Sequence, residues 1–143
     1  MKIKLVDSWY NEENGESYAK INTDYGYFEA YSQLHEEDAD IASRYAGCQY
    51  AETRAVLKYM KLRIKNLNLE LKGLENCQKA LEQKATYNPQ ELGCRTLRKQ
   101  IHILKRERYN WQSKYKSLSD KLYKAMSHRQ DILDKIIKRR ETK

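Results

Sequence analysis

The chain has 143 residues, of which 40% are hydrophobic and 34% are charged, and its formal net charge is +8. This length fits one domain, and so high a charge is typical of exposed helices rather than of a compact globule. No apolar run reaches the roughly 18 to 20 residues of a membrane span, and the first residues turn polar too early for a signal peptide. We therefore expect a soluble, cytoplasmic protein with no membrane partner.

The first third of the chain predicts three short strands. Residues 2–10 begin with strict alternation of polar and apolar side chains, and residues 25–31 are rich in aromatic β-formers. Asn14-Gly15 is a strong hairpin signal, in which we expect positive φ at both residues, so residues 17–21 should return antiparallel. After a second turn at residues 22–24, the third strand completes a meander. Three strands need cover on one face, and only helices can supply it here.

Residues 32–47 predict a short connecting helix. Acidic residues crowd its start, Arg44 lies near its end, and Gly47 is suited to a C-cap, so the chain should re-enter helix near Cys48 or Gln49. A metal site at the acidic cluster is the less favoured interpretation, because adjacent helix positions do not converge on one ion. The cluster comprises His35, Glu36, Glu37, Asp38 and Asp40.

Two long apolar seams dominate the rest of the chain. Apolar residues recur at alternating spacings of three and four, which is the heptad pattern of packed helices. The first seam holds Leu57, Met60, Ile64, Leu67, Leu71, Leu74 and Leu81, interrupted by Gln78. The second holds Leu97, Ile101, Leu104, Trp111, Tyr115, Leu118, Leu122, Ala125, Ile132 and Ile136. Asn88-Pro89 should end one helix and open the next.

These signals predict an α+β protein with a small N-terminal antiparallel three-stranded sheet and a long antiparallel helical hairpin. Residues 1–47 form the acidic, Tyr-rich part and residues 48–143 the basic hairpin, with its turn near 86–90, packed as one unit. Facing seam residues should have numbers that sum to about 175, which places Arg108 opposite Leu67 with its guanidinium near Glu70 or solvent. The second helix outlasts the first, and this overhang carries three candidate dimerisation residues, Ile132, Ile136 and Ile137.

Charge is divided unevenly along the chain. Residues 1–47 hold four Lys and Arg against ten Asp and Glu, a balance of −6, and residues 48–143 hold 24 against ten, a balance of +14. Such a basic half suggests an anionic partner, phosphate or acidic protein, although a solvated coiled-coil exterior or neutralisation by the acidic half would also explain it. The candidate nucleic-acid or acidic-partner residues are Arg98, Lys99, Lys105, Arg106, Arg108, Lys114, Lys116, Lys121 and Lys124. Tyr109 and Tyr123 could stack bases beside them.

Aromatic residues mark a second candidate surface. There are twelve Tyr and one Phe, and tyrosine either recognises partners or builds a half-exposed core in a thin sheet. We expect protein contact at Trp9, Tyr25, Tyr27 and Tyr31.

Catalytic and metal signals are weak. The three cysteines, Cys48, Cys77 and Cys94, form no C-x-x-C pair, and we expect small buried thiols, with Cys77 and Cys94 near one end of the hairpin. No nucleophile elbow or phosphate-binding glycine loop is present. We therefore expect a protein that is not an enzyme and has no cofactor or metal.

One stretch resembles a known class of proteins. The run His35-Glu36-Glu37-Asp38-Ala39-Asp40, followed by Gly47 and by Ala51-Glu52, Arg54 and Ala55, resembles small proteins carried by phages and mobile elements of Gram-positive bacteria. The resemblance implies a phage-encoded accessory or counter-defence protein in a bacterial host cell, and anti-CRISPR inhibitors are one such class. Many of those inhibitors are acidic DNA mimics, from which a basic hairpin departs.

Three functions follow as hypotheses. The first is a non-enzymatic binding protein that engages a nucleic-acid machine, such as a Cas complex, as an anti-CRISPR-type inhibitor. The second is an accessory protein whose basic hairpin binds DNA or RNA directly. The third is a structural coiled-coil adaptor that forms a homodimer.

Overall fold

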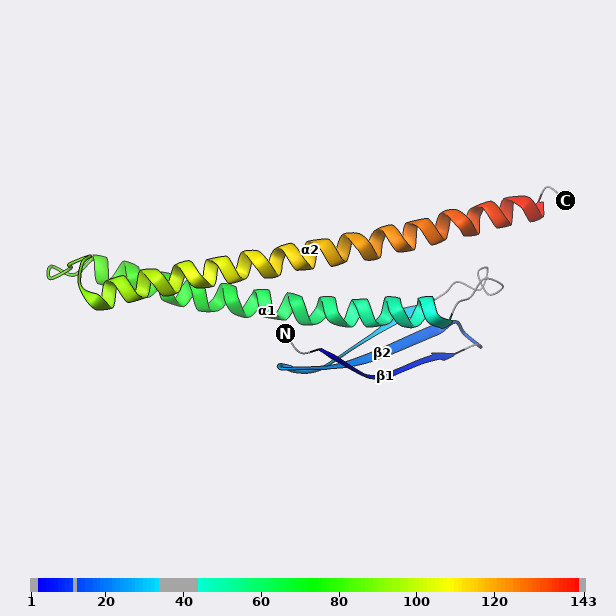
Figure 1. Cartoon of the computed structure of the whole chain (residues 1–143), viewed down its shortest axis with the longest axis horizontal. Coiled ribbons are helices and arrows are strands. Elements are labelled where there is room, and N and C mark those ends of the chain that lie inside the picture. The colour runs from blue at the N-terminus through cyan, green and yellow to red at the C-terminus, as the bar shows by residue number, and fades with distance from the viewer. Residues whose placement is uncertain (1–2, 12, 34–43, 142–143) are drawn as a thin grey trace. The chain divides into compact units, whose positions relative to one another are not determined.

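The computed structural model describes residues 3–11, 13–33 and 44–141, with side chains described except at 44–46, 128–137 and 139–141. A three-stranded antiparallel sheet is followed by two long helices, which confirms the predicted α+β fold with a helical hairpin (Figure 1). The elements are β1 (Lys4–Asn11), β2 (Glu16–Thr23), β3 (Gly26–Gln33), α1 (Arg44–Glu82) and α2 (Leu92–Glu141).

The chain divides into two compact units. The sheet unit comprises Met1–Tyr59 together with Lys116–Lys143, and the hairpin unit comprises Met60–Tyr115. Both helices therefore cross from one unit to the other, whereas the sequence prediction drew a boundary at residues 47 and 48.

In the sheet unit, the strands follow the order β1-β2-β3 with two short turns. Asn11 pairs with Glu16 across the first turn, where the Gly15 amide donates to the Asn11 carbonyl at 2.8 Å. Among the described residues of this turn, Gly15 has positive φ, at 69°, and Asn14 does not, so the expectation of positive φ at Asn14 is wrong. The loop is longer than a two-residue turn, so its backbone is not restricted to the conformation in which both Asn14 and Gly15 are left-handed.

The second turn lies one residue later than predicted, at Asp24 and Tyr25, between the paired residues Thr23 and Gly26. The Thr23 hydroxyl donates to the Gly26 carbonyl at 2.8 Å and accepts from the Tyr25 amide at 3.1 Å. This side chain thus satisfies backbone groups that the strand ladder leaves free.

One face of the sheet packs against the start of α1 (Figure 1). Both sides of this contact include small buried residues, Ala19 and Ala30 on the strands and Ala51 and Ala55 on the helix, which lets the helix approach the sheet closely. Tyr59 is fully buried, lies edge-on to Phe28 at 5.7 Å between ring centroids, and donates a hydrogen bond to Asp24. This contact supplies the cover that the three strands require.

Two cations of α1 also bind the backbone of β3. The Arg54 guanidinium donates to the Tyr31 carbonyl at 2.9 Å, and the Lys58 ammonium donates to the Glu29 carbonyl at 2.8 Å. They lie one helical turn apart and meet carbonyls two residues apart on the strand, so α1 and β3 are held along their length.

Gly47 corrects the predicted boundary of α1. The helix already begins at Arg44, so Gly47 lies inside it, is buried, and is not a C-cap. A Cβ at this position would overlap the Ser17 hydroxyl and lie 3.2 Å from the Ser17 Cβ. Glycine is therefore required by close approach of β2 to the helix rather than by a turn. The connecting helix predicted at residues 32–47 falls largely on residues 34–43, outside the described residues.

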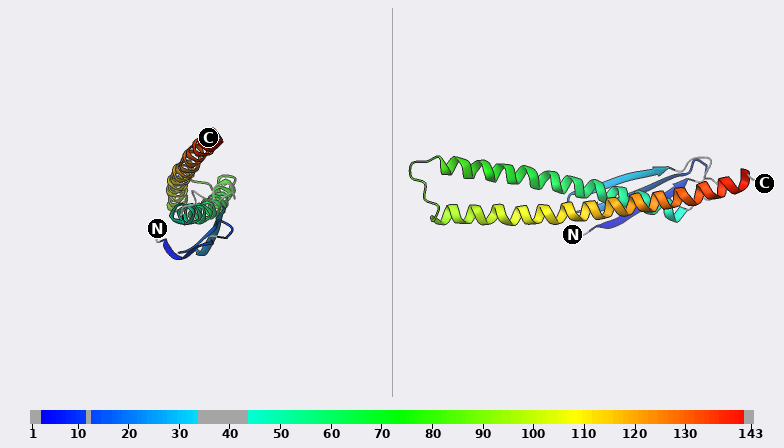
Figure 2. Two further views of the ribbon diagram at one scale, coloured as in Figure 1. Left: turned by 90° about the vertical axis from the view of Figure 1, so that its right-hand side faces the viewer. Right: turned by 90° about the horizontal axis from the view of Figure 1, so that it is seen from above.

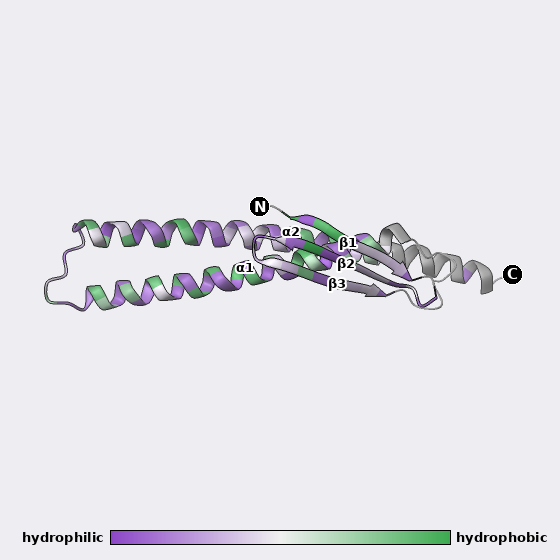
Figure 3. Cartoon of the chain, turned by 90° about the horizontal axis from the view of Figure 1, so that it is seen from below, coloured by the Kyte–Doolittle hydropathy of each residue, from purple (hydrophilic) through white to green (hydrophobic). Residues whose placement is uncertain are grey.

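In the hairpin unit, α1 and α2 run antiparallel from the connection at residues 83–91 (Figure 2), which agrees with the predicted turn near 86–90. The buried seam residues include Leu67 and Leu71 on α1 and Ile101 and Trp111 on α2. Green apolar and purple polar segments alternate along the coloured parts of both helices, as the heptad pattern requires (Figure 3). The seam is narrow, and most of the helical surface remains exposed.

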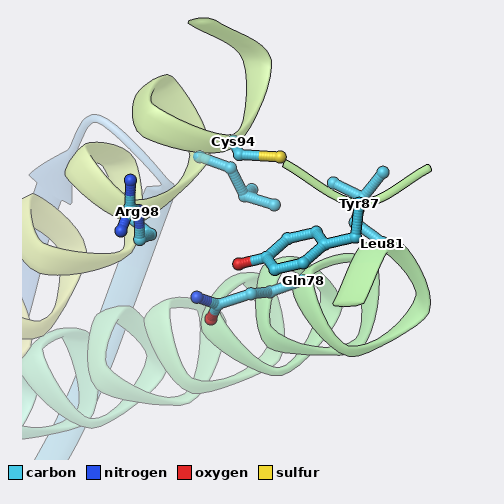
Figure 4. Close-up of a pocket in the computed structure, with 6 residues that line it drawn as sticks. Gln78, Leu81, Tyr87, Cys94 and Arg98 are labelled. Atoms are coloured by element: carbon cyan, nitrogen blue, oxygen red, sulfur yellow. The ribbon is translucent and has the colours of Figure 1, made fainter. Parts of the chain in front are cut away.

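The end of the seam is closed by Tyr87 from the connection (Figure 4). Its ring lies beside Gln78 of α1, with Cys94 of α2 nearby, around a hollow with room for about one water molecule. Gln78, which interrupts the apolar seam, therefore faces this small hollow. It is too small to bind a ligand.

Two further expectations differ in part from the structure. Arg108 was expected to reach Glu70 or solvent; its guanidinium is half-exposed and donates to the Asn68 amide oxygen at 3.2 Å, so its hydrogen-bond partner is a neutral side chain. Cys94 of α2 is buried as expected, but Cys77 of α1 is exposed. Both lie near the same end of the hairpin, but burial depends on which side of its helix a residue occupies. Cys48 is half-buried, with its thiol 3.7 Å from the Trp9 carbonyl.

No helix in the described part of the chain is long and apolar enough to cross a membrane.

Candidate functional site

Two of the nine predicted cations are engaged by uncharged groups of the hairpin unit. Arg98 donates to the Pro89 carbonyl at the helix connection, and Arg108 donates to Asn68. Both guanidinium groups therefore use part of their hydrogen-bonding capacity within the hairpin, which leaves fewer N–H donors for an external anion.

Two other predicted cations have local partners as well. The Lys105 ammonium lies 3.7 Å from a Glu75 carboxylate oxygen, and the Lys114 ammonium lies 5.2 Å from the centroid of the Trp111 ring. The Lys105 pair is exposed on both sides and is worth no more than about 1 kcal/mol. Lys114 is itself exposed, although the Trp111 ring that it contacts is buried, so both ammonium groups remain accessible to solvent.

The remaining five predicted cations are all exposed, and these are Lys99, Arg106, Lys116, Lys121 and Lys124. Among the described residues, none of them takes part in an ion pair. Lys99 and Arg106 belong to the hairpin unit and lie seven residues apart, on the same side of α2.

These two residues belong to a longer row on α2. Arg95, Lys99, His102, Arg106 and Tyr109 follow one another at spacings of four, three, four and three, and all five are exposed. At about 100° per residue, they occupy an arc of about 80° on the side of the helix away from the seam. We call these five residues the outer row.

The outer row has the chemistry of a phosphate-binding surface. From Arg95 to Arg106 it spans about 16 Å along the helix axis at 1.5 Å per residue. No acidic residue interrupts the row, and its last member, Tyr109, is 68% exposed. Cations without internal partners beside an exposed ring can neutralise phosphates and stack a base. The sequence prediction omitted Arg95 and His102, although their helical spacing from Lys99 and Arg106 was a readable signal.

The second candidate surface lies on the face of the sheet opposite α1. The register pairs Trp9 with Tyr18 and Tyr18 with Tyr31, so one aromatic side chain from each strand forms a single row. Ring centroids are 5.3 Å apart for Trp9 and Tyr18 and 5.1 Å for Tyr18 and Tyr31. Tyr18 is only 8% exposed, whereas Trp9 is 37% and Tyr31 48% exposed. We call these three residues the aromatic face.

A carboxylate is built into the aromatic face. The Tyr18 hydroxyl donates to a Glu29 carboxylate oxygen at 2.7 Å, and Glu29 belongs to the neighbouring cross-strand row with Lys20 and Asp7. This hydrogen bond to a charged acceptor, reinforced by burial and by the negative charge of Glu29, raises the pKa of Tyr18 to about 12. The face is therefore both aromatic and electronegative.

The predicted protein-contact residues divide between two places. Trp9 and Tyr31 belong to the aromatic face, and Tyr27 lies on the same side of the sheet with the Lys20 ammonium 4.6 Å from its ring centroid. Tyr25 is apart from them, since it sits in the turn and lies edge-on to Tyr59 at 5.8 Å. The sequence prediction omitted Tyr18 and Glu29, which only the strand register brings beside Trp9 and Tyr31.

The candidate dimerisation residues Ile132, Ile136 and Ile137 lie within α2, but their side chains are outside the described residues. Their role stays a prediction. Among the described residues, no three His, Cys, Asp or Glu side chains gather where they could hold a metal ion.

Comparison of the chain with protein-family models, with curated proteins and with solved structures finds no match.

Proposed function

We propose that this chain is a non-enzymatic binding protein that engages a nucleic-acid machine through phosphate contacts from the outer row of α2. The proposal places it in the cytoplasm of a bacterial host cell, as a phage-encoded counter-defence protein of the anti-CRISPR type. Its partner would be nucleic acid held in a nucleoprotein effector such as a Cas complex. Direct binding of free DNA or RNA is the alternative, and both use the same surface.

The observation that carries the proposal is the outer row. Three of its members, Arg95, Lys99 and Arg106, are exposed and take part in no ion pair among the described residues. Cations of a structural hairpin are expected to alternate with acids, because such pairs stabilise exposed helices. In a row that lacks acids, the like charges repel one another and destabilise the free protein. Binding of an anion removes this repulsion, so the row is favourable only in a complex.

The charge of the whole hairpin unit supports the same proposal. Residues 60–115 contain thirteen Lys and Arg against five Asp and Glu, a balance of +8. At physiological ionic strength the Debye length is about 8 Å, so Arg95 and Lys99, about 6 Å apart along the helix axis, act on the same stretch of a phosphate chain. Arg106 lies about 10 Å beyond Lys99 and can contact a further phosphate of that chain. Phosphate contacts of this kind give affinity without reading base sequence.

The test compares two variants with the same change in charge. The outer-row variant carries Arg95→Gln, Lys99→Gln and Arg106→Gln, and the control carries Lys65→Gln, Lys72→Gln and Lys79→Gln, which are exposed on α1 of the same unit. Binding to fluorescent single- and double-stranded DNA and RNA is measured at low salt. We expect the outer-row variant to lose about tenfold or more in affinity and the control to lose much less.

Equal losses in both variants would contradict the role of the outer row, since net charge alone would then explain binding. A second assay separates the two forms of the proposal by measuring cleavage by a purified Cas effector complex with each protein added. Inhibition that the outer-row variant lacks supports the inhibitor. Binding of free nucleic acid without any inhibition supports the direct nucleic-acid-binding alternative.

A further inference from the structure

The aromatic face is not used by the proposed phosphate contacts, and its surroundings identify a different kind of ligand. The cross-strand row on one side of it consists of Asp7, Lys20 and Glu29, and the row on the other side consists of Asn11, Glu16 and Gln33. Because alternate residues of a strand point to the same side, all of these flank the three rings on one face. Three carboxylates therefore border the rings, against one lysine.

That lysine, Lys20, already contacts another residue of the sheet, Tyr27. The Lys20 ammonium lies 4.6 Å from the Tyr27 ring centroid, so it stacks on an aromatic ring rather than covering the aromatic face. The sheet from Lys4 to Gln33 has two lysines against six acidic residues, a balance of −4. The electrostatic field around the rings is thus negative, and the contact between Lys20 and Tyr27 shows that this side of the sheet can hold a cation over an aromatic ring.

The charge excludes the usual ligand of an aromatic sheet surface. Single-stranded nucleic acid stacks its bases on such rings, but its phosphates need neighbouring cations, and here they would meet Asp7, Glu16 and Glu29. A purely apolar partner would leave those carboxylates without a counter-charge. A guanidinium group satisfies both features, since its plane stacks on an aromatic ring while its edge donates two hydrogen bonds to a carboxylate.

We propose that the aromatic face binds an arginine-rich segment of a partner protein, with a guanidinium group stacked on Trp9 or Tyr31 and paired with Glu29 or Asp7. Tyr18 forms the buried base of this surface and holds Glu29 in place through its hydroxyl. The interaction is independent of the outer row, so the protein would hold nucleic acid and a basic protein at separate surfaces. Many nucleic-acid machines expose arginine-rich segments, which makes the two interactions compatible.

The test measures binding of short fluorescent peptides to the full chain by anisotropy. An arginine-rich peptide, a lysine-rich peptide of the same length and a single-stranded oligonucleotide are compared at equal ionic strength. We expect the arginine peptide to bind more tightly than the lysine peptide, because only the guanidinium plane stacks on the rings.

Three substitutions locate the site. Trp9→Leu keeps an apolar side chain but removes the ring, and Glu29→Gln keeps the shape but removes the charge; we expect each to weaken arginine-peptide binding about fivefold or more. Glu13→Gln makes the same charge change in the exposed first turn and should leave binding within about twofold. Circular dichroism of each variant checks whether it remains folded, so that a loss of binding can be assigned to the site.

Several results would overturn the proposal. The first is no binding of the arginine peptide, and the second is an equal loss in Glu13→Gln, which would reduce the effect to net charge. If Trp9→Leu weakens binding of the oligonucleotide and not of the arginine peptide, the aromatic face binds nucleic-acid bases. Light scattering that shows self-association abolished by Trp9→Leu would assign it to a second copy. Trp9→Leu leaves the outer row intact, so the variant with Arg95, Lys99 and Arg106 changed to Gln tests the outer row separately.

Discussion

At the scale of single residues, Gly47 and Ser17 mark a close approach between helix and sheet. An alanine at position 47 would overlap the Ser17 hydroxyl, so we expect Gly47→Ala to lower the free energy of unfolding by about 1–3 kcal/mol. Gly73→Ala is the matched control, since Gly73 lies in the same helix with open space around it and should gain about 0.4–1 kcal/mol. Urea denaturation followed by circular dichroism measures both.

The Ser17 hydroxyl has no hydrogen-bond partner among the described residues. Ser17→Ala should therefore cost little, and in that background Gly47→Ala should be less destabilising because the overlapping atom is gone. A full penalty for Gly47→Ala in the Ser17→Ala background would show that the close approach is not the cause.

The raised pKa of Tyr18 predicts how the stability of the fold changes with pH. The folded state raises the pKa of Tyr18 to about 12 through the hydrogen bond to Glu29, whereas an unfolded tyrosine titrates near 10. The unfolded chain loses this proton first as pH rises, so the stabilising contribution is complete below about pH 10 and is lost toward pH 12. We expect Glu29→Gln to shift the titration of Tyr18 back toward 10.

The ultraviolet absorbance of tyrosinate measures this titration, and the difference between the wild type and Tyr18→Phe isolates Tyr18 from the other tyrosines. A Tyr18 pKa that Glu29→Gln leaves unchanged would contradict the assigned cause.

At the scale of elements, the helical seam and the turn between the helices were predictable, and the start of α1 at Arg44 was not. Heptad spacing identifies seam residues such as Leu67 and Ile101, because burial on one side of a helix depends mainly on periodicity. Gly47 could not be placed by the same reasoning, since its requirement comes from a strand distant in sequence. The turn at Gly15 was located correctly, but loop length altered the conformation of Asn14.

The seam makes a clear prediction on α1. Leu71 is 1% exposed and Leu69 is 60% exposed, two residues apart on the same helix. Leu71→Ala should cost about 2–5 kcal/mol through lost burial and a cavity, and Leu69→Ala should change stability by no more than about 0.5 kcal/mol. Thermal and urea unfolding of the two variants measure the contrast, and similar costs for both would contradict the assigned faces.

At the scale of the whole molecule, the uneven charge along the sequence gives two surfaces of opposite charge, the basic outer row and the aromatic face with its bordering carboxylates. The sequence predicted a basic hairpin and an aromatic, acidic head, but it did not separate cations with internal partners, such as Lys105, from the outer row. Helical spacing alone could have grouped Arg95 with Lys99 and Arg106. The carboxylates around Trp9 depend on strand register, which local sequence patterns do not determine.

The central claim is that the outer row binds phosphates, and the dependence of nucleic-acid affinity on salt tests it most directly. The logarithm of the binding constant is plotted against the logarithm of salt concentration for the wild type and for the variant with Arg95, Lys99 and Arg106 changed to Gln. We expect the variant slope to be shallower by about 2 on single strands and by about 3 on duplex, as three lost phosphate contacts require. Equal slopes for the two proteins, or no binding by the wild type at low salt, would contradict the claim.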